Sequence, residues 1–442
     1  MIEAKLEAAT AAVAAAPKWR GAGAVRSVTG PVVEAPLPGA RVGDGVRFEL
    51  PGAVRAGEVV AFEAGVARLL AFGATTGVGP GTPVSVTGPP RVLAGWDLLG
   101  RVVDPAGRVV DGGPPPPYAR LEPVPLHRAA PDPLARRPIE RALPTGVKVL
   151  DALVPLGEGQ RVGLFAGPGV GKSTLLGDIA AGTTADVVVA ALVGERGREV
   201  REFLEGPLAP ARQRSVVVVA TGEQPALLRA RAALCATALA EWFRDRGLKV
   251  LLLVDSLTRY ARALREVGLA AGEVPARAGY PPSVFAELPR LIERAGNGST
   301  GSITALYTVL AEGEGAADAV SEEVRGLVDG HVVLSRQLAE RGHWPAVDVP
   351  ASLSRVAARI TSEAQQRAAE VVRRHVVNYE ARRELVVLGA WEPGTDAEGD
   401  AAIAAWPRIE ALCRQAPGRP VPLEETLEHL EAAAREEAAP CA

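Results

Sequence analysis

The sequence predicts a multidomain α/β protein with a small N-terminal β-barrel, a central parallel sheet that carries a P-loop, and a C-terminal helical domain. Three observations lead to this fold class. Short valine-rich runs separated by Gly and Pro fill residues 21–92, apolar runs alternate with amphipathic segments between about 146 and 357, and helical patterns follow residue 360. A chain of 442 residues is also too long for one ordinary core.

Composition indicates a folded protein that has no general attraction for nucleic acid. Hydrophobic residues make up 48% of the chain, and 49 basic against 52 acidic residues give a formal charge of −3. The three cysteines lack CxxC spacing, so neither a disulfide framework nor a zinc site is indicated. The beginning of the chain lacks the apolar run of a signal peptide, and no stretch has the length of a membrane span. We therefore expect a cytoplasmic protein.

The N-terminal third contains three segments of different character. Residues 1–20 carry apolar residues at alternating steps of four and three, which fits a helix that binds a partner or a frayed, disordered end. Residues 21–92 contain runs such as "SVTGPVVEA" and "VARLLAF", the pattern of a small barrel or sandwich. The proline-rich residues 112–145 predict an extended connection laid over the next domain.

The central segment, residues 93–357, repeats a pattern of strand, loop and helix. "RVGLFAG", "ADVVVAALVG", "RSVVVVAT" and "KVLLLVDS" are continuous apolar runs, and each precedes an amphipathic stretch. Such runs are typical of parallel strands covered on both faces by helices. Residues 358–442 contain "SEAQQRAAEVVRRHVVNYEARRELVVLG" and "AAIAAWPRIEALCRQ", which predict a separate helical domain.

A phosphate-binding loop is predicted between the first of these strands and its helix, at "AGPGVGKST". Glycines there allow successive backbone N–H groups to turn toward phosphate oxygens, and the helix N-terminus adds its dipole. Lys172 is expected to neutralise the β- and γ-phosphates, Ser173 to bind Mg²⁺, and Thr174 to contact the α-phosphate. Ala166 replaces the first glycine of the motif, so the match is to its looser form. The predicted nucleotide-binding loop consists of Gly167, Pro168, Gly169, Val170, Gly171, Lys172, Ser173 and Thr174.

Acidic and basic residues that follow two other strands complete the predicted site. Asp255 ends "KVLLLVDS" and suits Mg²⁺ coordination, although many strands end in an Asp that caps a helix. Glu195 follows "ALVG" at the edge of the sheet where ligands bind; it is either the group that polarises the attacking water or a helix N-terminal acid. Arg196 and Arg259 are placed to face a γ-phosphate and favour the first interpretation.

Longer motifs make a family resemblance specific. "GERGREVREFLEG", "VDSLTRYARALREVGLAAGEVPARAGYPPSVFAELPRLIERAGN" and "VDGHVVLSRQLAERGHWPAVDVPASLSRV" closely resemble the export ATPases of flagellar and non-flagellar type III secretion systems. Those ATPases are similar in turn to the catalytic subunits of rotary ATP synthases. The resemblance covers about residues 21–415, and "GYPPSVFAELPRLIERAGN" favours the export branch over the synthase branch.

The resemblance implies a RecA-like ATPase core in a ring of six identical chains, with ATP and Mg²⁺ as cofactors. By analogy with the family, Glu195 polarises the attacking water. Trp344 would stack on adenine in its own chain, whereas Arg355 would reach into the neighbouring site as an arginine finger. The loop from about Leu269 to Pro282 would line the central channel and face a coiled-coil stalk protein.

The same resemblance implies further partners and a location. These are a peripheral stalk or regulator protein at the N-terminal helix, export chaperones and their substrates, and a membrane export gate. The ring would be cytoplasmic and peripherally associated with the inner membrane at the export apparatus, and no nucleic acid is expected as a partner.

The sequence departs from the family pattern at three places. The adenine-stacking position is usually Tyr rather than Trp344, and Gly222-Glu223 stands where "SD" is common. Pro168 has no backbone N–H to offer a phosphate, but the other amides of the loop can still converge. A larger aromatic face at Trp344 should keep adenine binding intact.

Two other functions share this core. A ring-shaped RNA translocase similar to the termination helicase would need basic and aromatic residues on the barrel and in the channel loop, and both are sparse here. A catalytic subunit of a proton-translocating ATP synthase would carry the synthase-type loop in place of "GYPPSVF". Neither alternative accounts for the motifs as well as protein export does.

Overall fold

The computed structural model describes residues 21–310 and 319–435 of the chain, so the predicted N-terminal helix of residues 1–20 lies outside it. The chain divides into two compact units. The described part of Met1–Arg91 forms the first unit together with Pro225–Leu227 and Glu266–Val274, and the remaining residues form the second. The predicted fold class is confirmed in both units.

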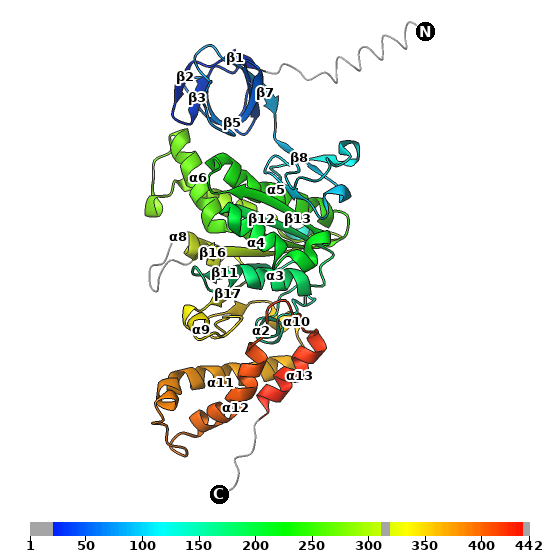
Figure 1. Ribbon diagram of the computed structural model, residues 1–442, viewed down its shortest axis with the longest axis vertical. Helices are drawn as coiled ribbons and strands as arrows, with labels where there is room; N and C mark the ends of the chain where they lie inside the picture. Colours follow the sequence, from blue (N-terminus) through cyan, green and yellow to red (C-terminus); the bar gives the residue numbers. More distant parts are fainter. Residues whose placement is uncertain (1–20, 311–318, 436–442) are drawn as a thin grey trace, which may run out of the picture. The chain divides into compact units, whose positions relative to one another are not determined.

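The first unit is a small antiparallel β-barrel (Figure 1). Its side chains alternate along the strands, so that Val46 and Phe48 point into the core while Arg47 and Glu49 face solvent. The strand order is β1-β7-β4-β5-β6-β3-β2. The strands are β1 (Ala22–Ala24), β2 (Ser27–Thr29), β3 (Val32–Ala35), β4 (Gly45–Leu50), β5 (Ala53–Glu63), β6 (Val66–Ala71) and β7 (Pro83–Gly88).

The second unit is built on a 9-stranded sheet of order β18-β17-β11-β16-β14-β12-β13-β9, in which β15 pairs with β16. All neighbours pair in parallel except β15 and β18, which run antiparallel to theirs. The strands are β9 (Val102–Val103), β11 (Arg161–Ala166), β12 (Val187–Glu195), β13 (Ser215–Thr221), β14 (Lys249–Asp255), β15 (Gly296–Asn297), β16 (Ser302–Leu310), β17 (Gly330–Leu334) and β18 (Leu353–Ser354). A separate pair joins β8 (Arg91–Ala94) to β10 (Glu122–Pro125).

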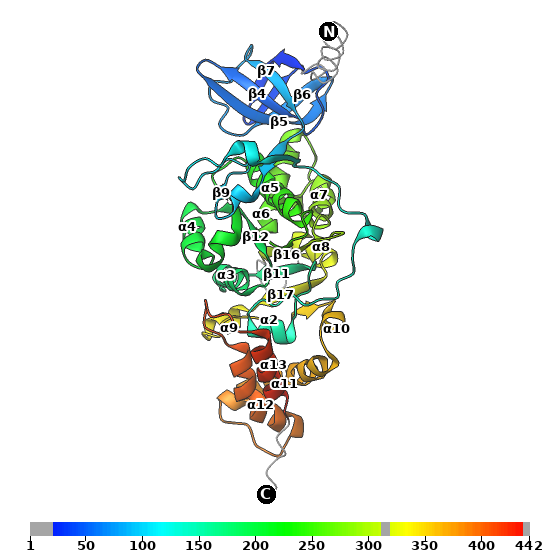
Figure 2. The ribbon, with the colours of Figure 1, turned by 90° about the vertical axis from the view of Figure 1, so that its right-hand side faces the viewer.

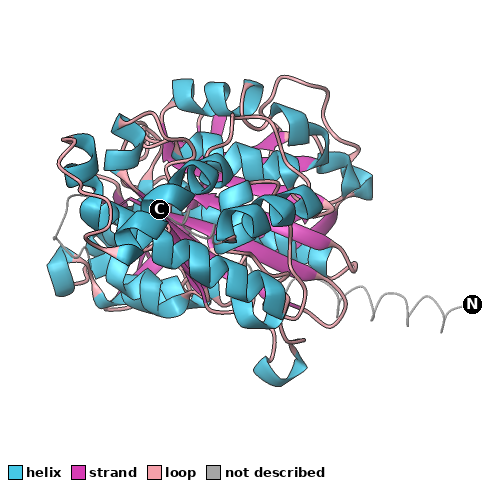
Figure 3. Cartoon of the chain, turned by 90° about the horizontal axis from the view of Figure 1, so that it is seen from below, coloured by secondary structure: helices cyan, strands magenta, loops and turns pink. Residues whose placement is uncertain are grey.

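Helices cover both faces of this sheet, which explains why strands such as β12 are apolar along their whole length. In Figure 2, α3 and α4 lie on one side of the strands and α7 and α8 on the other, and Figure 3 shows helices around the strands from below. The helices on the sheet are α3 (Lys172–Gly182), α4 (Gly197–Glu205), α5 (Ala226–Arg244), α6 (Leu257–Ala271), α7 (Pro282–Ile292) and α8 (Ala319–Leu327), and two short helices are α9 (Arg336–Glu340) and α10 (Ala357–Ile360).

The proline-rich connection lies over the second unit, as predicted. Arg136 Nη1 donates a 2.9 Å hydrogen bond to the carbonyl oxygen of Ala295. Arg137 Nη2 donates one of 2.7 Å to that of Thr300. Backbone carbonyls thus hold an otherwise irregular segment in place.

The C-terminal helices belong to the same compact unit as the sheet. They are α11 (Glu363–Val387), α12 (Ala397–Cys413) and α13 (Leu423–Ala434), and they pack on one another and on α2 (Lys148–Leu153). The Arg373 guanidinium on α11 donates to the carbonyl oxygens of Leu153 and Val349 at 2.7 and 2.9 Å. The predicted domain boundary between residues 357 and 358 stays a prediction.

Candidate active site

The loop between β11 and α3 has the backbone that an anion-binding turn requires. Gly169 and Gly171 have φ angles of 76° and 83°, a left-handed conformation that glycine adopts without strain. Pro168 lies exposed at the crown of the loop. No side chain caps the N-terminus of α3, so its first N–H groups remain available to an anionic ligand.

Lys172, the first residue of α3, contacts two carboxylates that come from other strands. Its Nζ hydrogen-bonds Asp255 Oδ1 at the end of β14 and lies 3.7 Å from Glu195 Oε1 at the end of β12. The side chains of Asp255 and Glu195 are only 6% and 9% exposed. The predicted lysine and both predicted carboxylates therefore meet at the carboxyl edge of the sheet.

Arginine side chains differ in their relation to this cluster. Arg259 on α6 lies with its Nη1 3.1 Å from Glu195 Oε2, and it also donates to the carbonyl oxygen of Gly194. Arg196 is 81% exposed and pairs with Glu199 at 3.0 Å on the surface of α4. The structure thus brings Arg259 to the site and does not bring Arg196 there.

Thr308 contacts the site and was missed in the sequence. Its hydroxyl donates a 2.7 Å hydrogen bond to Asp255 Oδ1 from the neighbouring strand β16. Together with Lys172 it orients the carboxylate. The strand also carries Ser302 and Thr304, so no local signal in the sequence singled out Thr308.

The surroundings of Glu195 raise the pKa of its carboxyl group to about 7. Burial, which penalises the charged form, is the main cause, and the negative charge of Asp255 adds to it. The positive charges of Lys172 and Arg259 act in the opposite direction. A carboxylate with a pKa near neutrality is well matched to accept a proton from water.

This pKa predicts how activity depends on pH. A general base must be deprotonated, and protonation of Glu195 as the pH falls through about 7 removes that form. We therefore expect kcat/KM for ATP to rise with pH up to about 7 and then to level off, because this profile reports groups of the free enzyme. Steady-state rates between about pH 5 and pH 8 measure it. A flat profile over this range would contradict a basic role for Glu195.

Trp344 lies against the P-loop of its own chain. A Cβ atom on Gly171 would come within 2.8 Å of Trp344 Cζ3, so the indole leaves no room for a side chain there. The backbone oxygen of Trp344 accepts a 2.9 Å hydrogen bond from Gln415 N, which ties this segment to the residues that follow α12. The indole of Trp344 therefore borders the loop, and its stacking on adenine stays a prediction.

Arg355 lies at the amino ends of the parallel strands, whereas the P-loop lies at their carboxyl ends. It follows β18, and its backbone N–H donates to the carbonyl oxygen of Asp329, next to the first residue of β11. Because β11 has 6 residues and a strand rises about 3.3 Å per residue, the two edges lie about 20 Å apart. The Arg355 side chain is exposed and makes no ion pair or side-chain hydrogen bond with any other described residue. It does not take part in the site of its own chain.

The residues at the carboxyl edge fit a magnesium nucleotide. Ser173 offers a hydroxyl in the first turn of α3 and Asp255 a carboxylate, which are oxygen ligands of the kind that Mg²⁺ prefers. In the described residues, no group of three or more His, Cys, Asp and Glu side chains is arranged to hold a metal. Mg²⁺ is usually bound through one or two carboxylates, with phosphates and water supplying the other ligands.

Family models match three segments of the chain. Residues 146–354 match the nucleotide-binding domain of the ATP synthase alpha/beta family, and residues 25–88 match the β-barrel domain of that family. Residues 361–432 match the T3SS EscN ATPase C-terminal domain. The C-terminal match favours an export ATPase over a synthase subunit or an RNA translocase.

Individual relatives give the same result. The chain is 52% identical to a type 3 secretion system ATPase of Xanthomonas euvesicatoria over 84% of each chain. It is 47% identical to a flagellum-specific ATP synthase of Treponema pallidum over 92% of each. Its fold is similar to the assembled ATPase EscN in complex with its central stalk EscO from enteropathogenic E. coli, with a TM-score of 0.86 and 41% identity over 93% of this chain and 100% of that one.

Proposed function

The chain belongs to the ATPases of type III protein export, and from this premise we propose that it hydrolyses Mg-ATP at the subunit interfaces of a homohexameric ring. The hydrolysis would release export substrates from their chaperones and feed them to a membrane gate. The observation that carries the proposal is the meeting of Lys172, Glu195 and Asp255 at one edge of the sheet, while Arg355 extends from the other. Loss of turnover without loss of ATP binding in a Glu195→Gln variant tests it.

The residues at the carboxyl edge divide the chemistry among them. The N–H groups of the loop and Lys172 would hold the β- and γ-phosphates and neutralise their charge. Glu195 would orient the attacking water and accept its proton, and Arg259 would hold the Glu195 carboxylate in place. Mg²⁺, held by Ser173 and through water by Asp255, would supply further neutralisation of the phosphate charge.

A ring is proposed because Arg355 lies far from the P-loop of its own chain. Its exposure and its distance of about 20 Å from that edge of the sheet support a role in the site of a neighbouring chain. An arginine finger supplied by another chain stabilises the charge that develops during phosphoryl transfer. A head-to-tail contact that closes on itself generates such a ring.

Proposed partners follow from the resemblance. EscN is solved with its central stalk EscO, and we propose that a similar coiled-coil stalk faces the loop of residues 269–282 here. Val274 in this loop is exposed, as a contact surface for a stalk requires. Export chaperones, a membrane export gate and a regulator at the N-terminal segment remain further proposals.

The proposed location is the cytoplasmic side of the inner membrane, with peripheral attachment at the export apparatus. Across residues 21–310 and 319–435, no helix combines the length and the apolar character needed to span a membrane.

Trp344 provides a test of nucleotide recognition. Replacing Trp344 by Ala should weaken ATP binding by about 5- to 150-fold, which corresponds to the roughly 1–3 kcal/mol of a base stacked on an aromatic ring. Trp344→Tyr should keep most of the affinity. Equilibrium binding of ATP and of inorganic tripolyphosphate separates the possible roles, because tripolyphosphate has no base. Equal weakening of both ligands would show that the indole supports the loop at Gly171 rather than adenine.

A further inference from the structure

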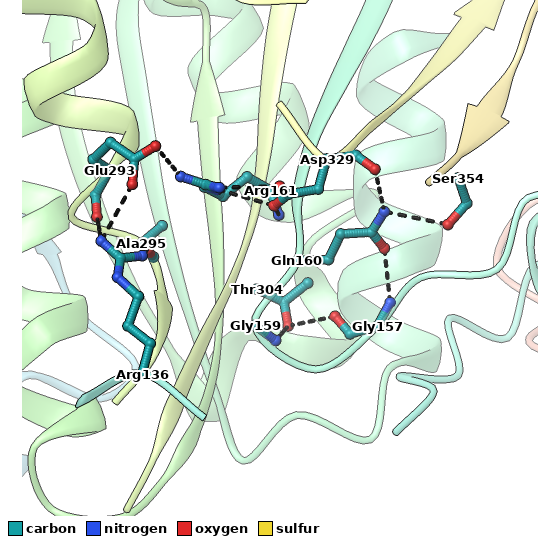
Figure 4. A network of polar contacts seen from close by, with 10 residues as sticks. All are labelled: Arg136, Gly157, Gly159, Gln160, Arg161, Glu293, Ala295, Thr304, Asp329 and Ser354. Carbon is teal, nitrogen blue, oxygen red and sulfur yellow. Dashed lines mark hydrogen bonds and ion pairs between the residues drawn. The ribbon is translucent and has the colours of Figure 1, made fainter. Parts of the chain in front are cut away.

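An ion pair at the amino edge of the sheet joins β11 to the turn before β17 (Figure 4). Arg161, the first residue of β11, makes a bidentate contact with Asp329 through two nitrogens of its guanidinium, with Nε–Oδ2 at 2.9 Å and Nη2–Oδ1 at 3.0 Å. The two side chains are 16% and 25% exposed. Paired contacts of this kind fix orientation as well as distance.

The pair is connected directly to the backbone that leads to Arg355. The N–H of Asp329 donates to the carbonyl oxygen of Arg161 at 2.8 Å, and the N–H of Arg355 donates to the carbonyl oxygen of Asp329 at 3.0 Å. Gln160 Nε2 donates to that same oxygen and to Ser354 Oγ, each at 3.2 Å. One hydrogen-bond network therefore connects the start of β11, the turn before β17 and the end of β18.

Close packing and further polar contacts surround this network. A Cβ atom on Gly330 would lie 2.6 Å from the carbonyl oxygen of Leu353, so β17 and β18 approach as closely as a glycine allows. On the other side, Arg161 also pairs with Glu293, whose backbone and side chain are held by Arg136. Figure 4 shows these contacts on both sides of Arg161.

We propose that Asp329 and Arg161 are positioning residues that aim Arg355 at the active site of the neighbouring chain. This inference rests on the proposed role of Arg355 in a ring. The Arg355 side chain is exposed and has no partner among the described residues of its own chain, so the position of its backbone decides which atoms it can reach. That backbone is held by the hydrogen bond from Arg355 N–H to the carbonyl oxygen of Asp329. Preorganised placement matters because a displacement of about 1 Å from productive geometry can cost about 100-fold in rate.

A second consequence of the geometry must be separated from this one. The strand that begins at Arg161 ends at the P-loop of the same chain. Breaking the ion pair in one chain could therefore have two effects. It could misplace Arg355, which acts in the active site of the neighbouring chain, or it could disturb the P-loop in the active site of the same chain. The two effects fall on different active sites of a ring, so mixtures of variants distinguish them.

The first experiment compares single variants of the full chain. Asp329→Asn removes the charge and keeps the size, and we expect kcat to fall about 10- to 100-fold with an unchanged Kd for ATP. Arg161→Lys keeps the charge but loses the two-armed contact; it should show the same pattern and provides the test if Asp329→Asn folds poorly. Asp111→Asn is the matched control, because it breaks a similar two-armed pair with Arg101, at 2.8 and 2.7 Å, beside β9 at the far end of the strand order. It should retain wild-type kcat.

A double variant tests whether Asp329 acts through Arg355. Adding Asp329→Asn to Arg355→Ala should lower kcat no further than Arg355→Ala alone, since the group that is being positioned is already absent. A further loss as large as that of Asp329→Asn by itself would overturn the proposal, as would wild-type kcat in both Asp329→Asn and Arg161→Lys.

Mixed assemblies decide which site is affected. Lys172→Ala chains have a defective P-loop but an intact Arg355, so mixing them equally with Asp329→Asn chains should restore roughly one interface in four. Mixing Asp329→Asn with Arg355→Ala chains should restore none. If Lys172→Ala rescues Arg355→Ala but not Asp329→Asn, the positioning role is wrong and the proposed function stands. If it rescues neither, the proposed role of Arg355 in the neighbouring site fails.

Discussion

Replacing Glu195 by Gln is expected to abolish ATP turnover while ATP binding stays nearly intact. Gln keeps the size of the side chain but does not accept a proton from water. Loss of a general base lowers kcat by about 10²- to 10⁴-fold. Lys172, the loop amides and Trp344 remain in place to bind the nucleotide. Phosphate release measured under saturating ATP, together with an equilibrium Kd for ATP, provides the two readouts.

A matched control makes this experiment specific. Glu202 lies on α4, where it pairs with Arg198 at 3.4 Å in an exposed position. Because such surface pairs contribute about 0–1 kcal/mol, Glu202→Gln should leave kcat nearly unchanged and the protein folded. Full activity in the Glu195→Gln variant would remove Glu195 from the mechanism and with it the assignment of this edge of the sheet as the catalytic site.

Replacing Arg355 by Ala is expected to lower kcat by about 10³- to 10⁵-fold, the usual contribution of an arginine finger to phosphoryl transfer. The affinity for ATP should change little, because Arg355 lies far from the P-loop of its own chain. Arg355→Lys should recover only part of the rate, since an ammonium group lacks the planar fork of a guanidinium. Arg359→Ala, which removes an exposed arginine from the nearby helix α10, serves as the control and should retain wild-type kcat.

Mixing experiments show whether Arg355 acts between chains. Lys172→Ala and Arg355→Ala chains should each be inactive alone. An interface is complete when an Arg355→Ala chain supplies the P-loop and a Lys172→Ala chain supplies Arg355. An equal mixture should therefore regain activity at roughly one interface in four. Absence of any recovery, with mixed assembly verified by differently tagged chains, would mean that Arg355 acts within its own chain. It would also remove the main reason for proposing a ring.

The fold was predictable from local patterns. Continuous apolar runs such as the one that became β12, alternating with amphipathic stretches, predicted a parallel sheet covered on both faces. The short valine-rich runs of residues 21–92 predicted the barrel, and the helical pattern after residue 360 predicted the C-terminal helices. Each of these signals repeats within a single strand or helix, so it does not depend on distant contacts.

The carboxyl edge of the sheet was also predictable, apart from Thr308, which was missed, and Arg196, which was wrongly included. Parallel strands end at the same edge, so residues that follow β11, β12 and β14 were expected to meet, and Lys172, Glu195 and Asp255 do. Arg196 does not join them although it is the next residue after Glu195. It has an extended backbone, with φ −72° and ψ 141°, so its side chain points away from that of Glu195 and reaches Glu199 instead.

Local sequence was therefore sufficient for the elements, their order and the residues that parallel strands bring to one edge, because those features follow from the periodicity and direction of single elements. Local sequence was not sufficient to assign roles to Trp344 and Arg355, which were inferred from a family resemblance. Only the folded chain shows that these two residues lie at opposite ends of the parallel strands. Local sequence also gave no sign of the pair between Arg161 and Asp329, which are 168 residues apart. Contacts of that kind depend on how the whole sheet packs, and no local pattern along the chain records them.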